Sequence, residues 1–90
     1  MEVFIMYDIS CDKKRNRVEK LLSSYGYRVN YSVFEISISK AKYKKLIQNL
    51  KDLTSKKDNV RVYILTKEVI KKSFRLHSHE GIFNNEELYF

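Results

Sequence analysis

The sequence predicts a single α+β domain in which two helices cover one face of an antiparallel sheet. Three observations lead to this prediction. The chain has 90 residues, which suits one domain. Hydrophobic residues make up 43% of it, a composition typical of folded chains. Segments with strand periodicity and helix periodicity follow one another in order, and no apolar run reaches the roughly 18 residues that a membrane span requires.

The first strand is expected over residues 2–7, where a run of apolar and aromatic residues is typical of a strand buried on both faces. A helix should follow, and either Ser10 or Asp12 can cap its start because a short side-chain oxygen accepts free amide protons there. Gly26 is expected just beyond its end, as the C′ residue. The apolar face of this helix is formed by Val18, Leu21, Leu22 and Tyr25.

Residues 27–39 alternate between apolar and polar side chains, and the parity changes between Val33 and Phe34. That change predicts a turn or bulge inside a tight hairpin. A second helix is expected from about Lys40 to Thr54. One face of it carries Tyr43, Leu46, Ile47, Leu50 and Leu53.

Residues 60–64 alternate again and predict a fourth strand, and residues 74–79 could form an additional C-terminal strand. We therefore expect a domain over residues 1–73 and a C-terminal strand and tail over residues 74–90. The order βαββαβ, with both helices on one face, is the ferredoxin-like arrangement. Because that fold hosts many functions, it does not identify one.

Charge is distributed unevenly along the chain, whose net charge is +7. All 18 basic residues lie between Lys13 and Arg75, a segment with only 5 acidic residues and therefore a net charge of +13. The first 12 and the last 15 residues each carry −3. A small domain with such a basic body favours a polyanionic partner, most often nucleic acid. The alternative is a lysine-rich surface that only keeps the protein in solution.

Two motif regions occur in order. The first comprises residues 7–10 (YDIS) and 12–18 (DKKRNRV), and the second comprises residues 25–30 (YGYRVN) and 32–35 (SVFE). With these motifs the chain resembles the CRISPR-associated protein two family from residue 1 to about residue 70. The family usually has glutamine where this chain has Asn30.

The resemblance implies a homodimer in which Asp8 of each chain approaches its twin. It also implies a metal-dependent endonuclease acting on RNA or DNA, with Mg²⁺ or Mn²⁺, and a central dimer that binds an integrase protein in the spacer-acquisition complex. The implied catalytic residues are Tyr7 and Asp8, with Asp8 as metal ligand. The implied nucleic-acid contacts are Arg15, Arg17, Arg28 and Phe34.

The residues themselves support a narrower case. Asp8 follows a hydrophobic strand, and Mg²⁺ can bind through one or two carboxylates together with water and substrate phosphate. A two-fold dimer would supply two Asp8 groups, whose repulsion a cation relieves. The alternative is that Asp8 caps the next helix or turn.

Arg15 and Arg17 point about 200° apart on a helix, so they cannot form one clamp and could equally be solvated. Tyr7 and Phe34 could be core residues.

Two histidines and the single cysteine are weaker candidates for functional residues. His77 and His79 would share one strand face, but a third metal ligand is not evident. Cys11 has no partner for an internal disulfide and is expected to be a loop thiol of a cytoplasmic protein.

Two rival functions stay open. They are a non-catalytic RNA-binding module on the same fold and a toxin-like ribonuclease relative.

Overall fold

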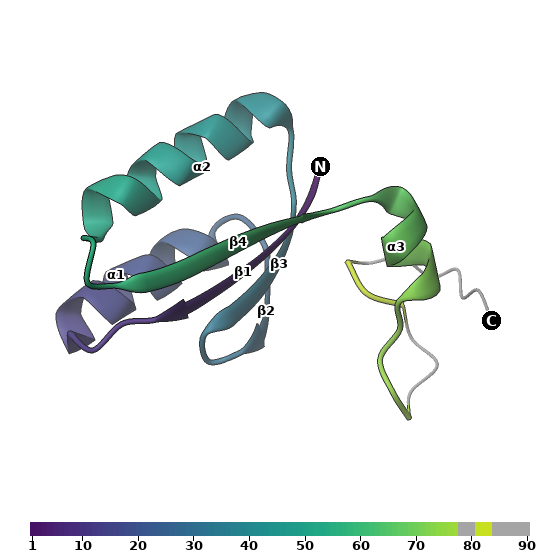
Figure 1. Ribbon diagram of the computed structural model, residues 1–90, viewed down its shortest axis with the longest axis horizontal. Coiled ribbons are helices and arrows are strands. Elements are labelled where there is room, and N and C mark those ends of the chain that lie inside the picture. Colours follow the sequence, from purple (N-terminus) through teal and green to yellow (C-terminus); the bar gives the residue numbers. More distant parts are fainter. Residues whose placement is uncertain (78–80, 84–90) are drawn as a thin grey trace.

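The structure, a computed structural model, describes residues 1–77 and 81–83. It is an α+β fold built on a four-stranded antiparallel sheet (Figure 1). The predicted βαββαβ order is confirmed. The elements are β1 (Glu2–Asp8), α1 (Asp12–Ser23), β2 (Tyr27–Asn30), β3 (Val33–Ser37), α2 (Lys40–Leu53), β4 (Asn59–Leu65) and α3 (Lys67–Lys72).

The sheet has the strand order β2-β3-β1-β4, and α1 and α2 cover one of its faces (Figure 1). Strand β1 pairs with both β3 and β4, so it is the strand that the core is built around. Both helices contribute the face that the sequence predicts, with Val18 and Leu22 of α1 and Leu46 and Leu50 of α2 buried. The other core residues are Val3, Ile5, Tyr7, Ile9, Phe34, Ile36 and Ile38.

Strand β1 is buried on the helix side only, which corrects the prediction of a strand covered on both faces. Its burial alternates along the chain, and Met6 and Asp8 on the second face are exposed. Phe4 also lies on that face, and its ring is 6.4 Å from the ring of Tyr63 on β4. The described residues of this chain provide no second layer there, so apolar side chains remain on an uncovered face of the sheet.

The ends of α1 differ from the prediction. The N-cap is Cys11, and neither Ser10 nor Asp12 occupies that position. Gly26 has a negative φ, so it is not the left-handed C′ residue that was expected. Its small size is needed for another reason, because a Cβ atom there would lie 2.5 Å from the carbonyl oxygen of Glu35 on β3. Helix α2 is capped by Ser39, whose hydroxyl accepts a hydrogen bond from the backbone amide of Lys42 (3.3 Å).

The hairpin between β2 and β3 contains both irregularities that the parity change allowed. Tyr31 and Ser32 form the turn, slightly before the expected position. The register also shifts between Arg28 and Asn30, as in a β-bulge. Within β3, Val33 pairs with the exposed Met6 and Phe34 pairs with the buried Ile5. The alternation in the sequence therefore breaks where apolar side chains pass from the uncovered face of the sheet to the core.

The chain leaves the sheet through α3, a helix that was not expected from the sequence (Figure 1). Of the strand expected over residues 74–79, residues 78 and 79 lie outside the described part. The described part contains one isolated antiparallel bridge, between Phe74 and Gly81, so it does not form the additional strand. The backbone amide of Phe83 donates to a carboxylate oxygen of Glu35 (3.3 Å). No helix among the described residues is long and apolar enough to cross a membrane.

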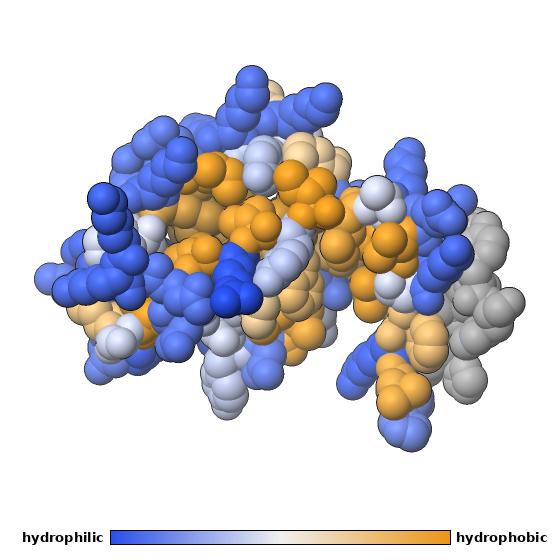
Figure 2. Space-filling model, viewed as in Figure 1, coloured by the Kyte–Doolittle hydropathy of each residue, from blue (hydrophilic) through white to orange (hydrophobic). Residues whose placement is uncertain are grey.

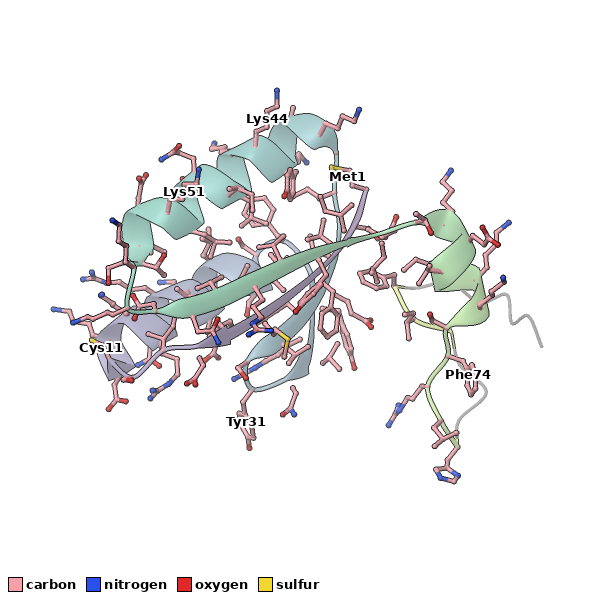
Figure 3. The ribbon with its side chains drawn as sticks, viewed as in Figure 1. Met1, Cys11, Tyr31, Lys44, Lys51 and Phe74 are labelled. Atoms are coloured by element: carbon pink, nitrogen blue, oxygen red, sulfur yellow. The ribbon has the colours of Figure 1, made fainter. Side chains whose placement is uncertain are left out.

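Polar and apolar surfaces are separated in this fold. Figure 2 shows hydrophilic side chains over the outer side of α2, and apolar side chains over the strands and between the strands and α2. Lys44 and Lys51 project from α2 away from the sheet (Figure 3). The basic side chains of this helix therefore form its solvent-facing surface.

Candidate functional site

Asp8 lies at the end of the central strand, where β1 finishes its pairing with β4 opposite Asn59. Its side chain is exposed. Its carboxylate accepts no hydrogen bond from a described residue and forms no ion pair with one; the nearby Arg15 is engaged by Ile9 and Asp12. The N-cap of α1 is Cys11, so Asp8 does not cap that helix as the alternative interpretation required. The strand therefore holds an uncommitted carboxylate at its carboxyl end.

An open pocket of about 380 Å³ lies beside this carboxylate. Its walls come from the end of β1, the first turns of α1 and the β2–β3 hairpin. The lining residues are Tyr7, Asp8, Ile9, Arg15, Glu19, Arg28, Tyr31 and Ser32. The fold thus brings together four of the six site residues named from the sequence, namely Tyr7, Asp8, Arg15 and Arg28.

Arg15 reaches the pocket from the first turn of α1. One guanidinium nitrogen donates to the backbone carbonyl of Ile9 (3.1 Å), and another forms an ion pair with Asp12. The side chain is still 41% exposed, so a polyanion can reach it from solvent. Because Ile9 directly follows Asp8, this hydrogen bond holds the arginine close to the end of β1.

Arg28 reaches the pocket from β2 and is held by more contacts than Arg15. It donates to Glu19 of α1 (2.8 Å) and to the backbone carbonyl of Tyr31 (2.9 Å). Its guanidinium carbon also lies 5.2 Å from the centre of the Tyr31 ring, within the range of a cation–π contact. Arg28 therefore joins α1 to the hairpin and shapes one wall of the pocket.

Tyr7 lies under the pocket floor with 5% of its surface exposed. Its hydroxyl donates a hydrogen bond to the backbone carbonyl of Tyr31 (3.0 Å). Burial raises the pKa of Tyr7 above its ordinary value, and the Glu19 carboxylate adds to this effect, whereas Arg28 and Arg15 oppose it. The phenol consequently keeps its proton at neutral pH and acts as a donor.

Two predicted site residues do not line the pocket. Arg17 is exposed on α1, on a different side of the helix from Arg15. Phe34 is fully buried and packs against Tyr7, with ring centres 6.4 Å apart. A ring with no exposed surface cannot stack on a base in this conformation, so the core interpretation of Phe34 replaces its assignment as a nucleic-acid contact.

The sequence did not predict the other lining residues of the pocket, which are Ile9, Glu19, Tyr31 and Ser32. Glu19 was only one acid within the basic segment, and nothing local linked it to Arg28, nine residues away. The alternation over residues 27–39 predicts Tyr31 as an apolar residue of a strand, whereas it lies in a turn. Its position beside the parity change was the signal that could have placed it in the turn.

The described residues contain no group of three or more His, Cys, Asp or Glu side chains that could hold a metal ion. Within the pocket, Glu19 is engaged by Arg28, which leaves Asp8 as the uncommitted carboxylate. Mg²⁺ binds proteins through one or two carboxylates when water and phosphate complete its shell. The donor set therefore fits a Mg²⁺ site shared between two copies better than one inside a single chain.

His77 and Cys11 do not line this pocket. His77 lies in a turn with a φ of 71°, and His79 falls outside the described residues, so their pairing stays untested. Cys11 is exposed at the start of α1 (Figure 3). The backbone amides of Lys14 and Lys13 lower the pKa of its thiol.

The family model for CRISPR associated protein Cas2 matches residues 1–73. The chain belongs to the Cas2 family. A Synechocystis relative named CRISPR-associated endoribonuclease Cas2 3 is 43% identical over 63 residues, covering 69% of this chain and 68% of the relative. A CRISPR-associated endoribonuclease Cas2 of Thermus thermophilus is 36% identical over 84 residues, covering 92% of this chain and 88% of that protein.

Solved structures agree with this membership in the Cas2 family. Cas2 from Streptococcus pyogenes superposes with a TM-score of 0.69 at 34% identity, over 74% of this chain and 88% of that one. A chain from a structure described as a partial Cas6-RT-Cas1–Cas2 complex gives a TM-score of 0.70 at 31% identity. That match covers 99% of this chain and 92% of the other. The Cas2 fold and sequence are therefore shared along most of the chain.

Proposed function

We propose that this chain is a subunit of a CRISPR adaptation complex, in which its homodimer bridges an integrase, binds duplex DNA and hydrolyses phosphodiester bonds with a divalent metal. Relatives named as endoribonucleases support the hydrolytic part. A neighbouring structure that combines Cas1 and Cas2 supports the integrase partner. The observation that carries the proposal is Asp8, an uncommitted carboxylate in a pocket that Arg15 and Arg28 also line.

The uncovered face of the sheet supports a homodimer. Met6, Tyr63 and Tyr27 are 37%, 44% and 65% exposed, and the strand pairing places all three on the side away from the helices. A chain of 90 residues buries a modest core, so covering this face would add useful apolar burial. A second copy with two-fold symmetry covers the same patch on both partners and supplies the second Asp8.

Each pocket residue then has a separate role. Asp8 binds the cation, which when bound lowers the pKa of a coordinated water and polarises the phosphodiester. Arg15 binds the phosphate, because its exposed guanidinium fork matches phosphate oxygens. Tyr7 keeps its proton and holds the hairpin carbonyl, so it positions the pocket and does not act as a base.

Duplex binding rests on the basic body of the chain. The outward surface of α2 carries lysines that lie away from the sheet, among them Lys44 and Lys51 (Figure 3). This surface and Arg17 on α1 are exposed. Exposed lysine and arginine side chains release counterions when they neutralise phosphates, and the resulting affinity tolerates any sequence. We therefore assign duplex binding to the helical side of the molecule.

The deciding experiment replaces Asp8 with asparagine, which keeps the size of the side chain but removes its charge. We expect Mg²⁺-dependent cleavage of a labelled RNA or DNA to fall by orders of magnitude, because the activated water is lost. Duplex affinity and melting temperature should stay unchanged. Asp52→Asn, an equal charge change at an exposed position of α2, is the matched control. Full cleavage by Asp8→Asn would end the catalytic assignment and leave a scaffold.

The dimer is tested separately by light scattering at micromolar concentration. We expect twice the mass of one chain, and Tyr63→Arg should shift the mass toward the monomer because it places charge on the apolar face. The control is Lys44→Glu, which changes charge on the outer side of α2. Monomeric wild-type protein would contradict the dimer and with it the shared metal site.

One observation favours the rival function, a non-catalytic RNA-binding module. Phe4 and Tyr63 pair their rings on the uncovered face of neighbouring strands, and RNA-binding folds of this kind stack bases on such aromatics. The two functions make opposite demands on this face. If the wild type is monomeric and Phe4→Ala abolishes RNA binding, the binding module is the better assignment.

A further inference from the structure

We infer that Tyr31 is a base-stacking residue that positions an unpaired nucleotide at the mouth of the Asp8 pocket. The inference deepens the proposed nuclease function and rests on it. Tyr31 lies in the turn between β2 and β3 and lines the pocket together with Asp8 and Arg15. Its side chain projects from the hairpin tip away from the body of the protein (Figure 3).

The backbone of Tyr31 is held from three directions. Its carbonyl oxygen accepts hydrogen bonds from the Tyr7 hydroxyl (3.0 Å) and from the Arg28 guanidinium (2.9 Å). Its amide donates to the side chain of Asn30 (2.7 Å). The next residue, Ser32, accepts from the backbone amide of Tyr7 (3.1 Å). The turn is therefore fastened to the end of β1, immediately before Asp8.

The ring of Tyr31, unlike its backbone, is largely exposed to solvent. The residue is 81% exposed, the highest value among the exposed large hydrophobic residues of the described chain. None of the hydrogen bonds that hold the turn involves the ring. The ring does contact the guanidinium of Arg28, which Glu19 and the Tyr31 carbonyl already hold by hydrogen bonds. A single exposed aromatic is common on protein surfaces, but one that is fastened beside a pocket has a fixed position relative to that pocket.

Arg28 determines which face of the ring is available. Its guanidinium carbon is 5.2 Å from the ring centre, so one face is supported by the cation. The exposure of the residue leaves the opposite face open to solvent. A base could stack on that open face while Arg15 binds the phosphate of the same strand. Stacking on aromatic rings is tolerant of sequence, since every base has a π-face, but it requires a base that is not already stacked in a duplex.

The test measures binding in the presence of EDTA, so that cleavage does not take part. The probes are a fluorescein-labelled 12-nucleotide single-stranded RNA and a DNA duplex of the same length. For Tyr31→Ala we expect single-strand affinity to fall roughly 5- to 150-fold, the range typical of one stacked base. Tyr31→Phe should keep wild-type affinity, and duplex affinity should stay within twofold for both variants.

The single strand offers its own matched control. Removing one base at a time from the RNA should weaken wild-type binding at one position and leave Tyr31→Ala unaffected at that position. Equal losses on single strand and duplex, or no loss by Tyr31→Ala, would overturn the assignment even if wild-type protein cleaves RNA with Mg²⁺. Wild-type protein that neither binds nor cleaves nucleic acid would instead overturn the proposed function, and this inference with it.

Discussion

The hydroxyl of Tyr7 donates a hydrogen bond to the backbone carbonyl of Tyr31, and the two atoms are 3.0 Å apart. This contact ties the end of the central strand to a turn 24 residues later in the sequence. The Arg28 guanidinium donates to the same carbonyl (2.9 Å). One backbone oxygen thus joins β1, β2 and the hairpin turn at the edge of the candidate site.

Tyr7→Phe should destabilise the fold by about 0.5–1.5 kcal/mol, the typical net contribution of one hydrogen bond. The ring contact with Phe34 is retained in this variant, so the loss isolates the hydroxyl. Urea unfolding at neutral pH measures it. Tyr27→Phe, at a residue that is 65% exposed, is the control and should have little effect. Equal stability of Tyr7→Phe and wild type would show that Arg28 alone satisfies the carbonyl.

Asp58 should give the protein a dependence of stability on acid pH. Its carboxylate accepts from the backbone amide of Ser55 (2.9 Å) and forms an ion pair with Lys14 of α1 (3.1 Å). The Ser55 amide, helped by Lys14, lowers the pKa of Asp58 below its ordinary value. A lowered folded pKa means that this stabilisation is complete above the ordinary carboxyl pKa and is lost as pH falls through the folded value.

We therefore expect Asp58→Asn to be less stable than wild type at pH 7. The difference should shrink as the pH is lowered below about 4, the ordinary carboxyl range, because wild type then becomes protonated as well. Urea unfolding between pH 7 and pH 2.5 checks this. Asp52→Asn provides the same charge change at an exposed position. A constant difference between wild type and Asp58→Asn across this range would contradict the prediction.

Gly26→Ala should destabilise the protein by about 1–3 kcal/mol, as overpacking does elsewhere. The added Cβ would lie 2.5 Å from the backbone oxygen of Glu35 and 2.5 Å from a side-chain carbon of Ile36. Strand β3 cannot move away easily, since Ile36 is fully buried. Thermal unfolding measures the change, and Ser23→Ala at the exposed end of α1 should remain within about 0.5 kcal/mol of wild type.

Duplex affinity should fall linearly with salt on logarithmic axes, with a slope near −0.9 for each phosphate neutralised. Arg15→Ala and Arg17→Ala should each weaken binding and reduce the magnitude of the slope, because each removes one cation from the basic body. Fluorescence anisotropy between 50 and 300 mM salt gives the slope. Val69→Ala, at an exposed uncharged position of α3, should leave it unchanged. An affinity independent of salt would reject an electrostatic mode of binding.

Elements with local signals could be predicted from the amino-acid sequence. Helical spacing at Val18 and Leu22, and again at Leu46 and Leu50, predicted the buried faces of α1 and α2, because periodicity directly reports which side of a helix avoids water. The βαββαβ order followed from the same reasoning. The motif around Asp8 pointed to the correct family, and four of the six residues that it suggested do line one pocket.

Contacts among those residues, and the residues that surround them, depend on the folded chain. Glu19 pairs with Arg28, nine residues away in the sequence, and Lys14 pairs with Asp58, 44 residues away. No local pattern encodes either pairing. Phe34 is aromatic, like an exposed stacking residue. It pairs with Ile5 of β1, however, and this register places its side chain in the core. Tyr31 becomes exposed because a bulge and a two-residue turn change the direction of the chain there. Such outcomes depend on how the strands pair, which is a property of the folded chain as a whole.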